Sequence, residues 1–285
     1  MSRLEVEMPE LAEVEHGRRV AHEHLVGRTI IEAVVAEDPI VVDGSTSVEV
    51  SRALEGALVL DTHRRGKHLW LELDRRPWPL LHFGMTGAFR TRADQPLELE
   101  TSGKKVDRSW PPRFCKLRLV LDDGGEFAMT NARRLGRIRL RDDPSSEPPI
   151  SKLGYDPFLE LPTAEDFDRR IGRRTAVIKS LLLNQAFAAG VGNWIADEVL
   201  YQARLDPRRR AHQLTSSERD RLRLTIADVV HTACAVNARK DGFPKDWLFH
   251  HRWGKVEGSK TSTGEVVEFL EIGGRTTAWA PARQG

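Results

Sequence analysis

The chain has 285 residues, of which 40% are apolar and 30% are charged; this balance excludes general disorder and predicts about two domains. Two cysteines, Cys115 and Cys234, are too few for a disulfide-stapled scaffold or for a zinc site built from four cysteines. The 44 Lys and Arg residues nearly balance the 42 Asp and Glu residues, so total charge alone does not indicate a nucleic-acid partner. No apolar run approaches the roughly 18 residues of a membrane span, and the acidic start is unlike a signal peptide. We therefore expect a soluble, intracellular protein.

The first half of the chain is predicted to be one helix followed by many short strands. Apolar residues recur at helical spacing from Glu10 to Leu25, and Gly27 follows as a stop. The β-like runs, most of them bounded by Gly, Pro or Asp, cover residues 29–36, 57–62, 68–73, 80–83, 116–121, 126–130 and 137–140. One helix with many short strands predicts a β-sandwich or barrel with a helix attached.

The second half is predicted to be mainly helical. Residues 142–149 are rich in Pro, Ser and acidic side chains and are the best candidate for a linker. Helical patterns follow over 163–171, 175–187, 194–203 and 215–237, and a Gly-punctuated β-like segment covers 255–279. We therefore expect an α+β protein with a β-rich domain, a helical domain and a small terminal hairpin.

Positive charge is concentrated in three arginine clusters, which lie within residues 133–141, 169–174 and 208–210. Such segregation in a nearly neutral chain favours a surface that faces phosphates. The alternative is a solvated face of surface salt bridges, which any one cluster can form.

Four motifs, in order along nearly the whole chain, carry a family resemblance. They are MPELAEVE at 8–15, RRGKHLWLEL at 64–73, GVGNWIADE at 190–198 within Gln185–Leu200, and GGRTTAW at 273–279. With them the sequence resembles the formamidopyrimidine-DNA glycosylase / endonuclease VIII family of DNA repair enzymes. The resemblance implies an α+β fold: a β-sandwich domain with a leading helix, a helix-two-turn-helix domain and a terminal hairpin finger. The last motif lacks zinc ligands and is similar to the zincless, plant-type branch.

The resemblance also sets the expected domain limits. Residues 1–7 are an extension or a misassigned start, and residues 8–142 form the catalytic β-sandwich domain. A linker covers 143–160, the helix-two-turn-helix domain 161–250 and the zincless finger 251–285.

Pro9 is the nucleophile that the resemblance implies. A proline at the start of a chain is a secondary amine, which can attack sugar C1′, displace the base and hold the sugar as an iminium that permits β- and δ-elimination. The resemblance makes Glu10 the acid that helps to open the deoxyribose ring. On residue type alone, Pro followed by Glu is more typical of a helix start.

Eight residues precede Pro9 in this sequence, and an amide nitrogen in mid-chain cannot attack the sugar. The chemistry therefore needs translation from Met8 with removal of the methionine, or cleavage of the extension, and we favour the misassigned start. The alternative is a non-catalytic member of the family that binds damaged DNA, with the Pro9 nitrogen blocked by residues 1–8.

Three further residues are expected to contact DNA phosphates. Lys67 follows a turn at Gly66, and by resemblance it contacts the phosphates that flank the lesion and aids elimination. Asn193 is expected to cap a helix that begins at Trp194, whose N–H groups would form a phosphate site. By resemblance Asn193 and Arg275 contact phosphate, and Arg275 assists the final elimination. From residue types alone, a solvated lysine and a plain helix-turn-helix remain alternatives.

An enzyme that extrudes a base must fill the vacancy. By resemblance Met85 and Arg133 do so together with Leu135, which stands where the family usually has phenylalanine; for Met85 core packing is the alternative. The other expected site residues are Arg174 and Lys179 on the DNA-binding surface and Glu13 in the lesion pocket.

We therefore expect a bifunctional DNA glycosylase/AP lyase that excises formamidopyrimidines and oxidised guanines without a metal or organic cofactor. The short segment 237–244 is similar to plant-type enzymes with this preference. The expected partner is damaged double-stranded DNA rather than a membrane, for a monomer in the bacterial cytoplasm with its nucleoid or in a eukaryotic nucleus. A third alternative is an RNA- or ribosome-associated protein sharing only the helix-two-turn-helix, but the first and last motifs oppose it.

Overall fold

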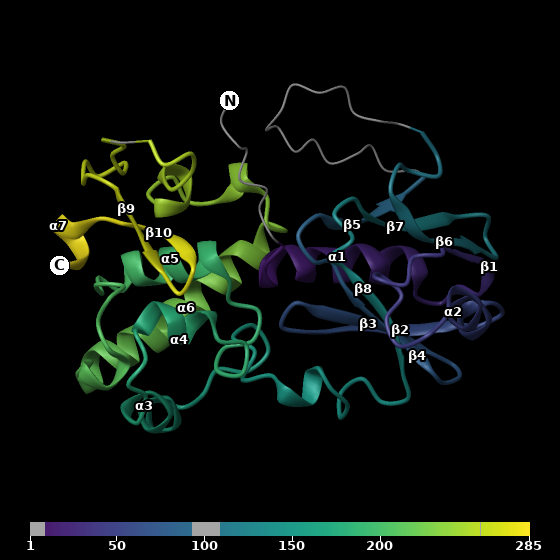
Figure 1. The fold of residues 1–285 in the computed structure, drawn as a ribbon, viewed down its shortest axis with the longest axis horizontal. Helices are drawn as coiled ribbons and strands as arrows, with labels where there is room; N and C mark the ends of the chain where they lie inside the picture. The colour runs from purple at the N-terminus through teal and green to yellow at the C-terminus, as the bar shows by residue number, and fades with distance from the viewer. Residues whose placement is uncertain (1–8, 93–108, 257) are drawn as a thin grey trace. The chain divides into compact units, whose positions relative to one another are not determined.

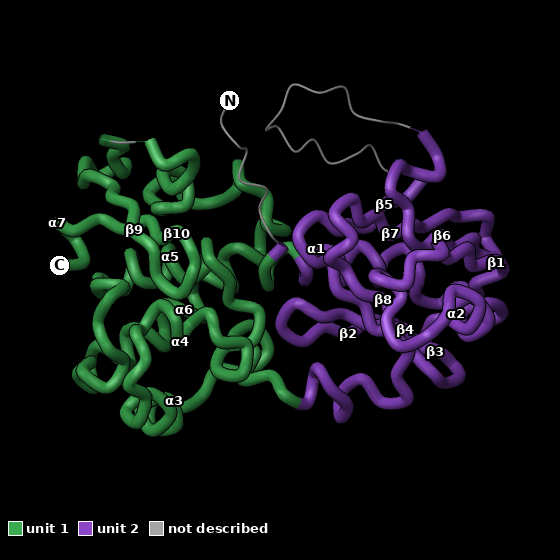
Figure 2. Tube along the Cα trace, viewed as in Figure 1, with its two compact units in different colours: residues 1–5, 10–13, 152–285 green, residues 6–9, 14–151 purple. Residues whose placement is uncertain are grey.

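The structure is a computed structural model that describes residues 9–92, 109–256 and 258–285. The chain divides into two compact units (Figure 2). The first, here termed the β unit, contains Pro9 and residues 14–151; the second, the helical unit, contains residues 10–13 and 152–285. Within the described ranges, no helix is long and apolar enough to cross a bilayer.

The β unit is built from two four-stranded antiparallel sheets (Figure 1). The first sheet has the order β1-β6-β7-β5, formed by Ile30–Val35, Cys115–Leu121, Glu126–Asn131 and Gly87–Thr91. The second has the order β2-β3-β4-β8, formed by Val59–Arg65, His68–Leu73, Trp78–His82 and Arg137–Arg141. Helix α2 (Ser47–Leu54) and most of helix α1 (Leu11–Leu25) complete the unit.

Alternating apolar side chains explain why the two sheets pack face to face. In β6, Leu117, Leu119 and Leu121 are buried at every second position, and β7 places Met129 and Phe127 opposite the first two. One hydrophobic core contains residues from both sheets and both helices of the unit. The expected β-sandwich with a leading helix is therefore confirmed.

The helical unit contains the remaining elements. Its helices are α3 (Ala164–Gly172), α4 (Ile178–Leu183), α5 (Asn193–Gln202), α6 (Ser216–Ala235) and the terminal α7 (Pro281–Gln284). It also has 3₁₀ turns at Ala211–Gln213, Lys240–Gly242 and Leu248–His251, and a further 3₁₀ turn, Ile150–Lys152, lies where the chain passes from the β unit to the helical unit. Strands β9 (Glu268–Ile272) and β10 (Arg275–Trp279) form an antiparallel hairpin. Helix α5 lies at the centre, where its Trp194 packs against the rings of Phe243, Trp247 and Phe249.

One predicted helix is wrong in extent. The sequence pattern predicts a helix over 175–187, but α4 covers only Ile178–Leu183. Val177 is extended and forms a bridge with Arg210, and Asn184 ends the helix. On the C-terminal side of α4, Phe187 continues the apolar pattern because it belongs to the same core, so periodicity alone could not locate that end of the helix.

Helix α2 and strand β5 are among the elements that were not predicted. Helix α2 begins with a capping box, in which Thr46 and Glu49 each accept a hydrogen bond from the other's backbone N–H. This Thr-x-x-Glu spacing is a recognisable helix start that the sequence does contain. Strand β5 begins at Gly87, where a side chain would overlap the carbonyl of Phe83, so a backbone contact and not a β-forming residue starts the strand.

Glu198 is a fully buried acid on helix α5. Its carboxylate accepts hydrogen bonds from the Phe249 backbone N–H at 2.7 Å and from the Gln202 amide at 2.8 Å. Burial dominates over these hydrogen bonds and raises the pKa of Glu198 to about 7. In the unfolded chain the same carboxyl group ionises near its ordinary value, so this group destabilises the fold increasingly as the pH rises from about 4.5 to about 7.

We predict that Glu198→Gln changes how stability depends on pH. Relative to this variant, the parent chain should lose about 3 kcal/mol of unfolding free energy between pH 4.5 and pH 8, because only the parent must ionise a buried acid. Urea denaturation of both proteins across this range measures the difference. Glu218→Gln is the control. Arg209 lowers the pKa of Glu218 to about 2, so the contribution of Glu218 to the unfolding free energy changes with pH only below pH 4.5. Parallel curves for the parent and Glu198→Gln would contradict the prediction.

Candidate functional site

Glu10 lies at the N-terminal end of helix α5. Its carboxylate accepts backbone N–H groups from Gly192 at 3.0 Å, Trp194 at 2.9 Å and Ile195 at 3.1 Å. These are donors that the first turn of a helix leaves without partners inside the helix. A side chain at Gly192 would overlap the carboxyl carbon of Glu10, so this close approach requires glycine. Glu10 therefore takes up three of the N–H groups that the sequence predicts to be open to DNA phosphate, and the N–H of Asn193 is not among them.

Asn193 does not cap the helix as expected. Helix α5 begins at Asn193 itself, and Gly192 is its N-cap residue. The Asn193 amide instead donates a hydrogen bond to the Thr276 carbonyl on strand β10 at 2.9 Å. A carbonyl acceptor requires a donor, which fixes the orientation of the amide. Asn193 thus connects the start of α5 to the terminal hairpin that carries Arg275.

Lys179 is placed where a direct contact with DNA is not possible. Its side chain is 0% exposed and forms an ion pair with Asp197, which is also 0% exposed. The ammonium donates as well to the Thr276 carbonyl at 3.3 Å. Burial lowers the pKa of Lys179, and the carboxylates of Asp197 and Glu10 oppose this shift. The predicted DNA-binding role of Lys179 is corrected to an internal one, because a buried, paired ammonium cannot meet a phosphate.

Pro9 and Glu13 lie close to Glu10 in the chain: Pro9 directly precedes it, and Glu13 follows three residues later. Pro9 is half-buried, and helix α1 begins two residues later at Leu11, so the expected helix start is also present. The Glu13 carboxylate accepts the backbone N–H of Glu10 at 3.0 Å. The Leu11 N–H donates to the Gly190 carbonyl at 3.1 Å, which adds a second connection between this segment and the turn before α5.

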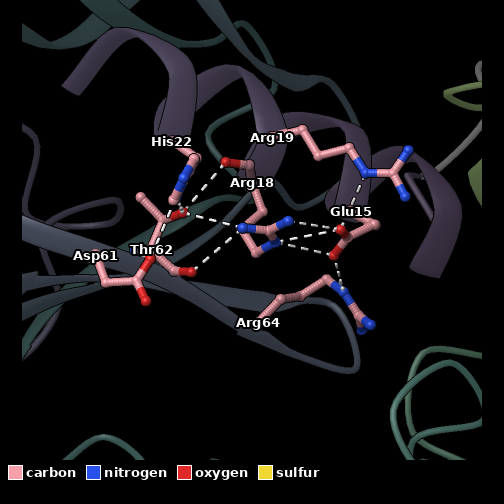
Figure 3. Close-up of polar contacts among 7 residues, drawn as sticks. All are labelled: Glu15, Arg18, Arg19, His22, Asp61, Thr62 and Arg64. Atoms are coloured by element: carbon pink, nitrogen blue, oxygen red, sulfur yellow. Dashed lines mark hydrogen bonds and ion pairs between the residues drawn. The ribbon is translucent and has the colours of Figure 1, made fainter. Parts of the chain in front are cut away.

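Lys67 lies in the two-residue turn between strands β2 and β3, at the strand end where the sequence predicts it. The carbonyl of the preceding Gly66 accepts a hydrogen bond at 3.0 Å from Arg64, whose side chain is 1% exposed. Arg64 also donates to Glu15 of helix α1 at 3.0 Å. This buried pair joins the turn that carries Lys67 to the helix that follows Pro9 along the chain (Figure 3).

Glu15 is surrounded by three guanidinium groups. Arg18 donates to both of its oxygens, Arg19 donates at 3.2 Å, and Arg64 completes the group (Figure 3). Burial raises the pKa of Glu15, but the hydrogen bonds and charges of Arg18 and Arg64 outweigh it and leave the pKa below 4.5. Three cations around one anion leave a local excess of positive charge next to the Lys67 turn.

Two histidines connect the Lys67 turn to the Met85 loop. The rings of His68 and His82 lie 4.7 Å apart, and His82 accepts the Gly84 N–H at 3.0 Å. Burial and the neighbouring positive charges lower the pKa of His68 to about 3 and that of His82 to about 4. Both rings are therefore neutral at pH 7, and His82 is free of the proton that would prevent it from accepting this hydrogen bond.

Met85 and the pair Arg133 and Leu135 lie on two loops of the β unit that pack against each other. The Arg133 backbone N–H donates to the Thr86 hydroxyl at 3.2 Å. A side chain at Gly84, where φ is +61°, would overlap the Leu135 backbone. Met85 is half-buried and is not part of the hydrophobic core of this unit, so the core-packing alternative is not supported. Leu135 is 42% exposed.

Asn131 and Arg134 fix the second of these loops. The Asn131 carbonyl oxygen accepts the N–H groups of Leu135 and Gly136 at 3.0 and 3.1 Å, and its amide donates to Phe83. Arg134 has a positive φ of 55° and forms a two-pronged ion pair with Asp38, with both contacts at 2.9 Å. These hydrogen bonds hold the pKa of Asp38 well below its usual range.

Ion pairs account for most of the arginine clusters, as the salt-bridge alternative predicts. The pairs are Arg134 with Asp38, Arg137 and Arg139 with Asp43, Arg169 with Asp166, Arg208 with Asp206, and Arg209 with Glu218. By contrast, the exposed side chains of Arg133, Arg174 and Arg275 have no hydrogen bond or ion pair within the described ranges. These three arginines can take a phosphate without first breaking an ion pair.

Several residues that support these positions were not predicted: Glu15, Arg64, Asp38, Asp197 and Asn131. The i, i+3 and i, i+4 spacing of Glu15 with Arg18 and Arg19 is a signal that sequence reasoning could have used. The ion-pair partners of Arg64, Asp38 and Asp197 lie 18 or more positions away in the sequence. Asn131 bonds to the nearby Leu135 and Gly136 as well as to the distant Phe83. In the part of the chain that the structure describes, no three His, Cys, Asp or Glu side chains group as metal ligands.

The family model for the formamidopyrimidine-DNA glycosylase N-terminal domain matches residues 8–138, and the model for the H2TH domain of this glycosylase matches residues 153–243. A curated protein of Arabidopsis thaliana, named formamidopyrimidine-DNA glycosylase, is 39% identical over 97% of this chain and 71% of its own length.

Two solved structures are also similar to the chain. One is MutM in complex with DNA containing carbocyclic 8-oxo-G, at 25% identity and a TM-score of 0.80, covering 97% of this chain and 100% of that one. The other is a Lactococcus lactis FPG mutant in complex with Fapy-dG containing DNA, at 25% identity and a TM-score of 0.79, covering 97% of this chain and 99% of that one.

We predict that Gly84→Ala destabilises the loop pair more than a matched control does. Gly124 also has a positive φ, at +81°, but a side chain there meets nothing within 4 Å. Gly124→Ala should cost about 1 kcal/mol from backbone strain, and Gly84→Ala about 3 kcal/mol because it adds a backbone clash. Thermal or urea unfolding of the two variants measures the difference. Equal losses would show that the loops do not pack as described.

We predict that Glu15→Gln destabilises the β unit by about 3 kcal/mol at pH 7, because it leaves the buried Arg64 guanidinium without its anion. The pKa of Glu15 is lowered in the fold, so its stabilisation is present above pH 4.5 and is lost as the pH falls through the folded pKa. The variant should therefore show a weaker acid dependence in urea melts. Glu49→Gln, at an exposed helix cap, is the control and should cost much less. A loss no larger than that of the control would refute the assigned role.

Proposed function

Because the chain belongs to the formamidopyrimidine-DNA glycosylase family, we propose that it excises oxidised bases from duplex DNA and cleaves the resulting abasic site with Pro9 as nucleophile. DNA glycosylase activity on damaged double-stranded DNA is the activity of this family. The residue roles that follow are part of the proposal. The observation that carries them is the Glu10 carboxylate, held by three backbone N–H groups directly beside Pro9 in the chain.

The proposed reaction begins with the lone pair of the Pro9 nitrogen, which attacks sugar C1′ while the bond to the base breaks. The nitrogen then releases its proton, and the base takes up a proton as it leaves. The nitrogen lone pair then forms the iminium as the ring oxygen leaves C1′, and Glu10 supplies the proton that this oxygen takes up. Loss of a 2′ hydrogen as a proton expels the 3′ phosphate, and loss of the 4′ hydrogen as a proton then expels the 5′ phosphate. Because a carboxylate accepts hydrogen bonds from N–H donors, the α5 end holds Glu10 in place while it exchanges this proton.

The Pro9 nitrogen must be an amine for this chemistry. An α-amino group titrates near pH 8, so on the order of a tenth of it is unprotonated and nucleophilic at pH 7. When residues precede Pro9, the nitrogen is an amide and its lone pair is delocalised. The sequence has eight residues before Pro9, and this observation supports the second candidate function, a DNA-binding protein without catalysis.

The remaining site residues are proposed to bind and shape the DNA. Phosphates are contacted by Lys67, Arg174 and Arg275. Asn193 contacts phosphate as well, through the second N–H of its side-chain amide, because the first donates to the Thr276 carbonyl. Three further side chains, those of Met85, Arg133 and Leu135, fill the space of the extruded base. Glu13 is proposed to line the lesion pocket from the first turn of helix α1.

The lesion is proposed to be a formamidopyrimidine or an oxidised guanine. The similar solved structures hold DNA with carbocyclic 8-oxo-G and with Fapy-dG. The short segment 237–244 supports the plant-type preference for formamidopyrimidines, and its Phe243 is buried against Trp194 and Trp247 rather than extended as a loop.

The protein works in a compartment that contains DNA, as its bacterial and plant relatives do. We propose the bacterial cytoplasm with its nucleoid, or the nucleus if the source is eukaryotic.

We predict that a chain that begins at Pro9 forms a covalent adduct with a Fapy- or 8-oxoguanine-containing duplex when borohydride reduces the iminium. Pro9→Gly and Glu10→Gln should each reduce base release about a hundredfold, because they remove the ring amine and the proton donor. Gel electrophoresis of the trapped adduct and of the cleaved strand measures both steps. Glu23→Gln, at an exposed position of the same helix, should leave them unchanged.

The two candidate functions give opposite results in this assay. If the chain that begins at Pro9 binds the lesion duplex but never forms an adduct, the catalytic proposal fails and the binding-only function stands. If the full 285-residue chain forms the adduct without any processing, Pro9 is not the nucleophile.

A further inference from the structure

Asp197 is a buried carboxylate that reaches three separate segments of the helical unit. It lies on helix α5 with a side chain that is 0% exposed. One oxygen accepts the ammonium of Lys179 on α4, and the other accepts Arg252 at 2.8 Å and the backbone N–H of Ala278 on strand β10 at 3.1 Å. Arg252 is itself only 5% exposed, so the whole group is removed from solvent.

Strand β10 is held at a second point by partners of the same group. The Thr276 carbonyl accepts the Lys179 ammonium at 3.3 Å and the Asn193 amide at 2.9 Å. Residues two apart in a strand direct their backbone polar groups to the same edge. Thr276 and Ala278 therefore present one edge of β10 to helix α5, while β9 pairs with the strand on its other side.

Arg275 directly precedes Thr276, the first of these two anchored positions. It opens β10 directly after the turn at Gly273 and Gly274, whose φ values are +59° and +71°. Its side chain is exposed and has no hydrogen bond or ion pair in the described part of the chain. An exposed arginine on a short hairpin loses conformational freedom when it binds a phosphate, and a fixed backbone reduces that loss.

We propose that Asp197 is a positioning residue for DNA binding: by holding Ala278 directly and Thr276 through Lys179, it fixes the backbone from which Arg275 meets a phosphate. This inference rests on the proposed function, because Arg275 must contact DNA for its position to matter. Asp197 itself lies too deep to touch DNA and acts only through β10.

The charge of Asp197 is what the positioning requires. The group contains two cations, Lys179 and Arg252, and Asp197 is the carboxylate that hydrogen-bonds to both. An asparagine has the same shape, but it offers one acceptor oxygen and turns an N–H donor towards another donor. It therefore cannot serve Lys179, Arg252 and Ala278 together. With its N–H group towards Arg252 and Ala278, the direct anchor at Ala278 is lost; with that group towards Lys179, the anchor at Thr276 is weakened, because only Asn193 still holds it.

The experiment measures binding of the full chain to a duplex that carries a tetrahydrofuran residue, at several salt concentrations. Arg275→Ala should weaken binding about tenfold and reduce the slope of log affinity against log salt by about 0.9, the value for one phosphate contact. Asp197→Asn should reproduce most of both losses. The double variant should bind no more weakly than Arg275→Ala alone, because Asp197 acts through Arg275.

Glu198→Gln is the matched control, since Glu198 is the adjacent buried acid on α5 and hydrogen-bonds to Gln202 and Phe249 but not to β10. It should leave the salt slope unchanged. Hydrogen exchange adds a direct readout: Asp197→Asn should speed exchange of the Ala278 amide selectively, and Glu198→Gln should not. Lys179→Met is the second variant if Asp197→Asn does not fold; it keeps Asp197 paired with Arg252 and should give a smaller loss, because Asn193 still holds Thr276.

Two results would overturn the inference and spare the proposed function. One is an Asp197→Asn protein, or Lys179→Met in its place, that is folded and keeps the parent's salt slope. The other is an Arg275→Ala effect of equal size in both backgrounds, which indicates a purely structural role for Asp197. Failure of the parent chain to prefer the tetrahydrofuran duplex over undamaged DNA would instead refute the proposed function itself.

Discussion

The insertion of the Glu10 carboxylate into the first turn of helix α5 is the interaction on which the rest of the site depends. A helix end leaves backbone N–H groups that need acceptors, and here the acceptor comes from a residue more than 180 positions away in sequence. Gly192 makes the approach possible, and Gly190 accepts the N–H of Leu11 with its carbonyl. Because Glu10 is fixed and one peptide bond joins it to Pro9, Pro9 has little freedom to move. The proposed nucleophile is thus located by backbone hydrogen bonds and needs no dedicated side chain.

Several of the residues proposed to meet DNA stand next to a buried or half-buried ion pair. Lys67 follows the turn that Arg64 and Glu15 hold, and Arg133 and Leu135 flank Arg134, which Asp38 holds. Such pairs add little net stability once desolvation is counted, but removing one partner is costly, so they select one arrangement over others. The paired arginines therefore shape loops, while the unpaired arginines remain available to phosphate. The unpaired arginines thus carry positive charge that no ion pair neutralises, even though the net charge of the chain is only +2.

The sequence predicted well those features that depend on local patterns. Strand β3 has the predicted limits, and helix α1 differs by one residue, because alternation and helical periodicity are carried by neighbouring residues. The helix predicted over 175–187 was too long because a shared core gives apolar residues to turns as well as to helices. Lys179 and Asn193 were identified by resemblance, but their partners Asp197 and Thr276 were not. Those partners lie 18 and 83 positions away, and no local pattern encodes such a pairing.

One short stretch of helix α5 positions two residues of the proposed site, Glu10 and Arg275. The backbone of Trp194 and Ile195 binds Glu10, while the side chains of Asn193 and Asp197 bind the backbone of β10. Backbone groups at a helix start point along the axis, and side chains point outwards, so five consecutive residues can serve two partners without competition. A displacement of this turn would change the position of Glu10 and that of Arg275 together. The acid beside the nucleophile and the arginine proposed to assist elimination are therefore held in a common frame by residues 193–197.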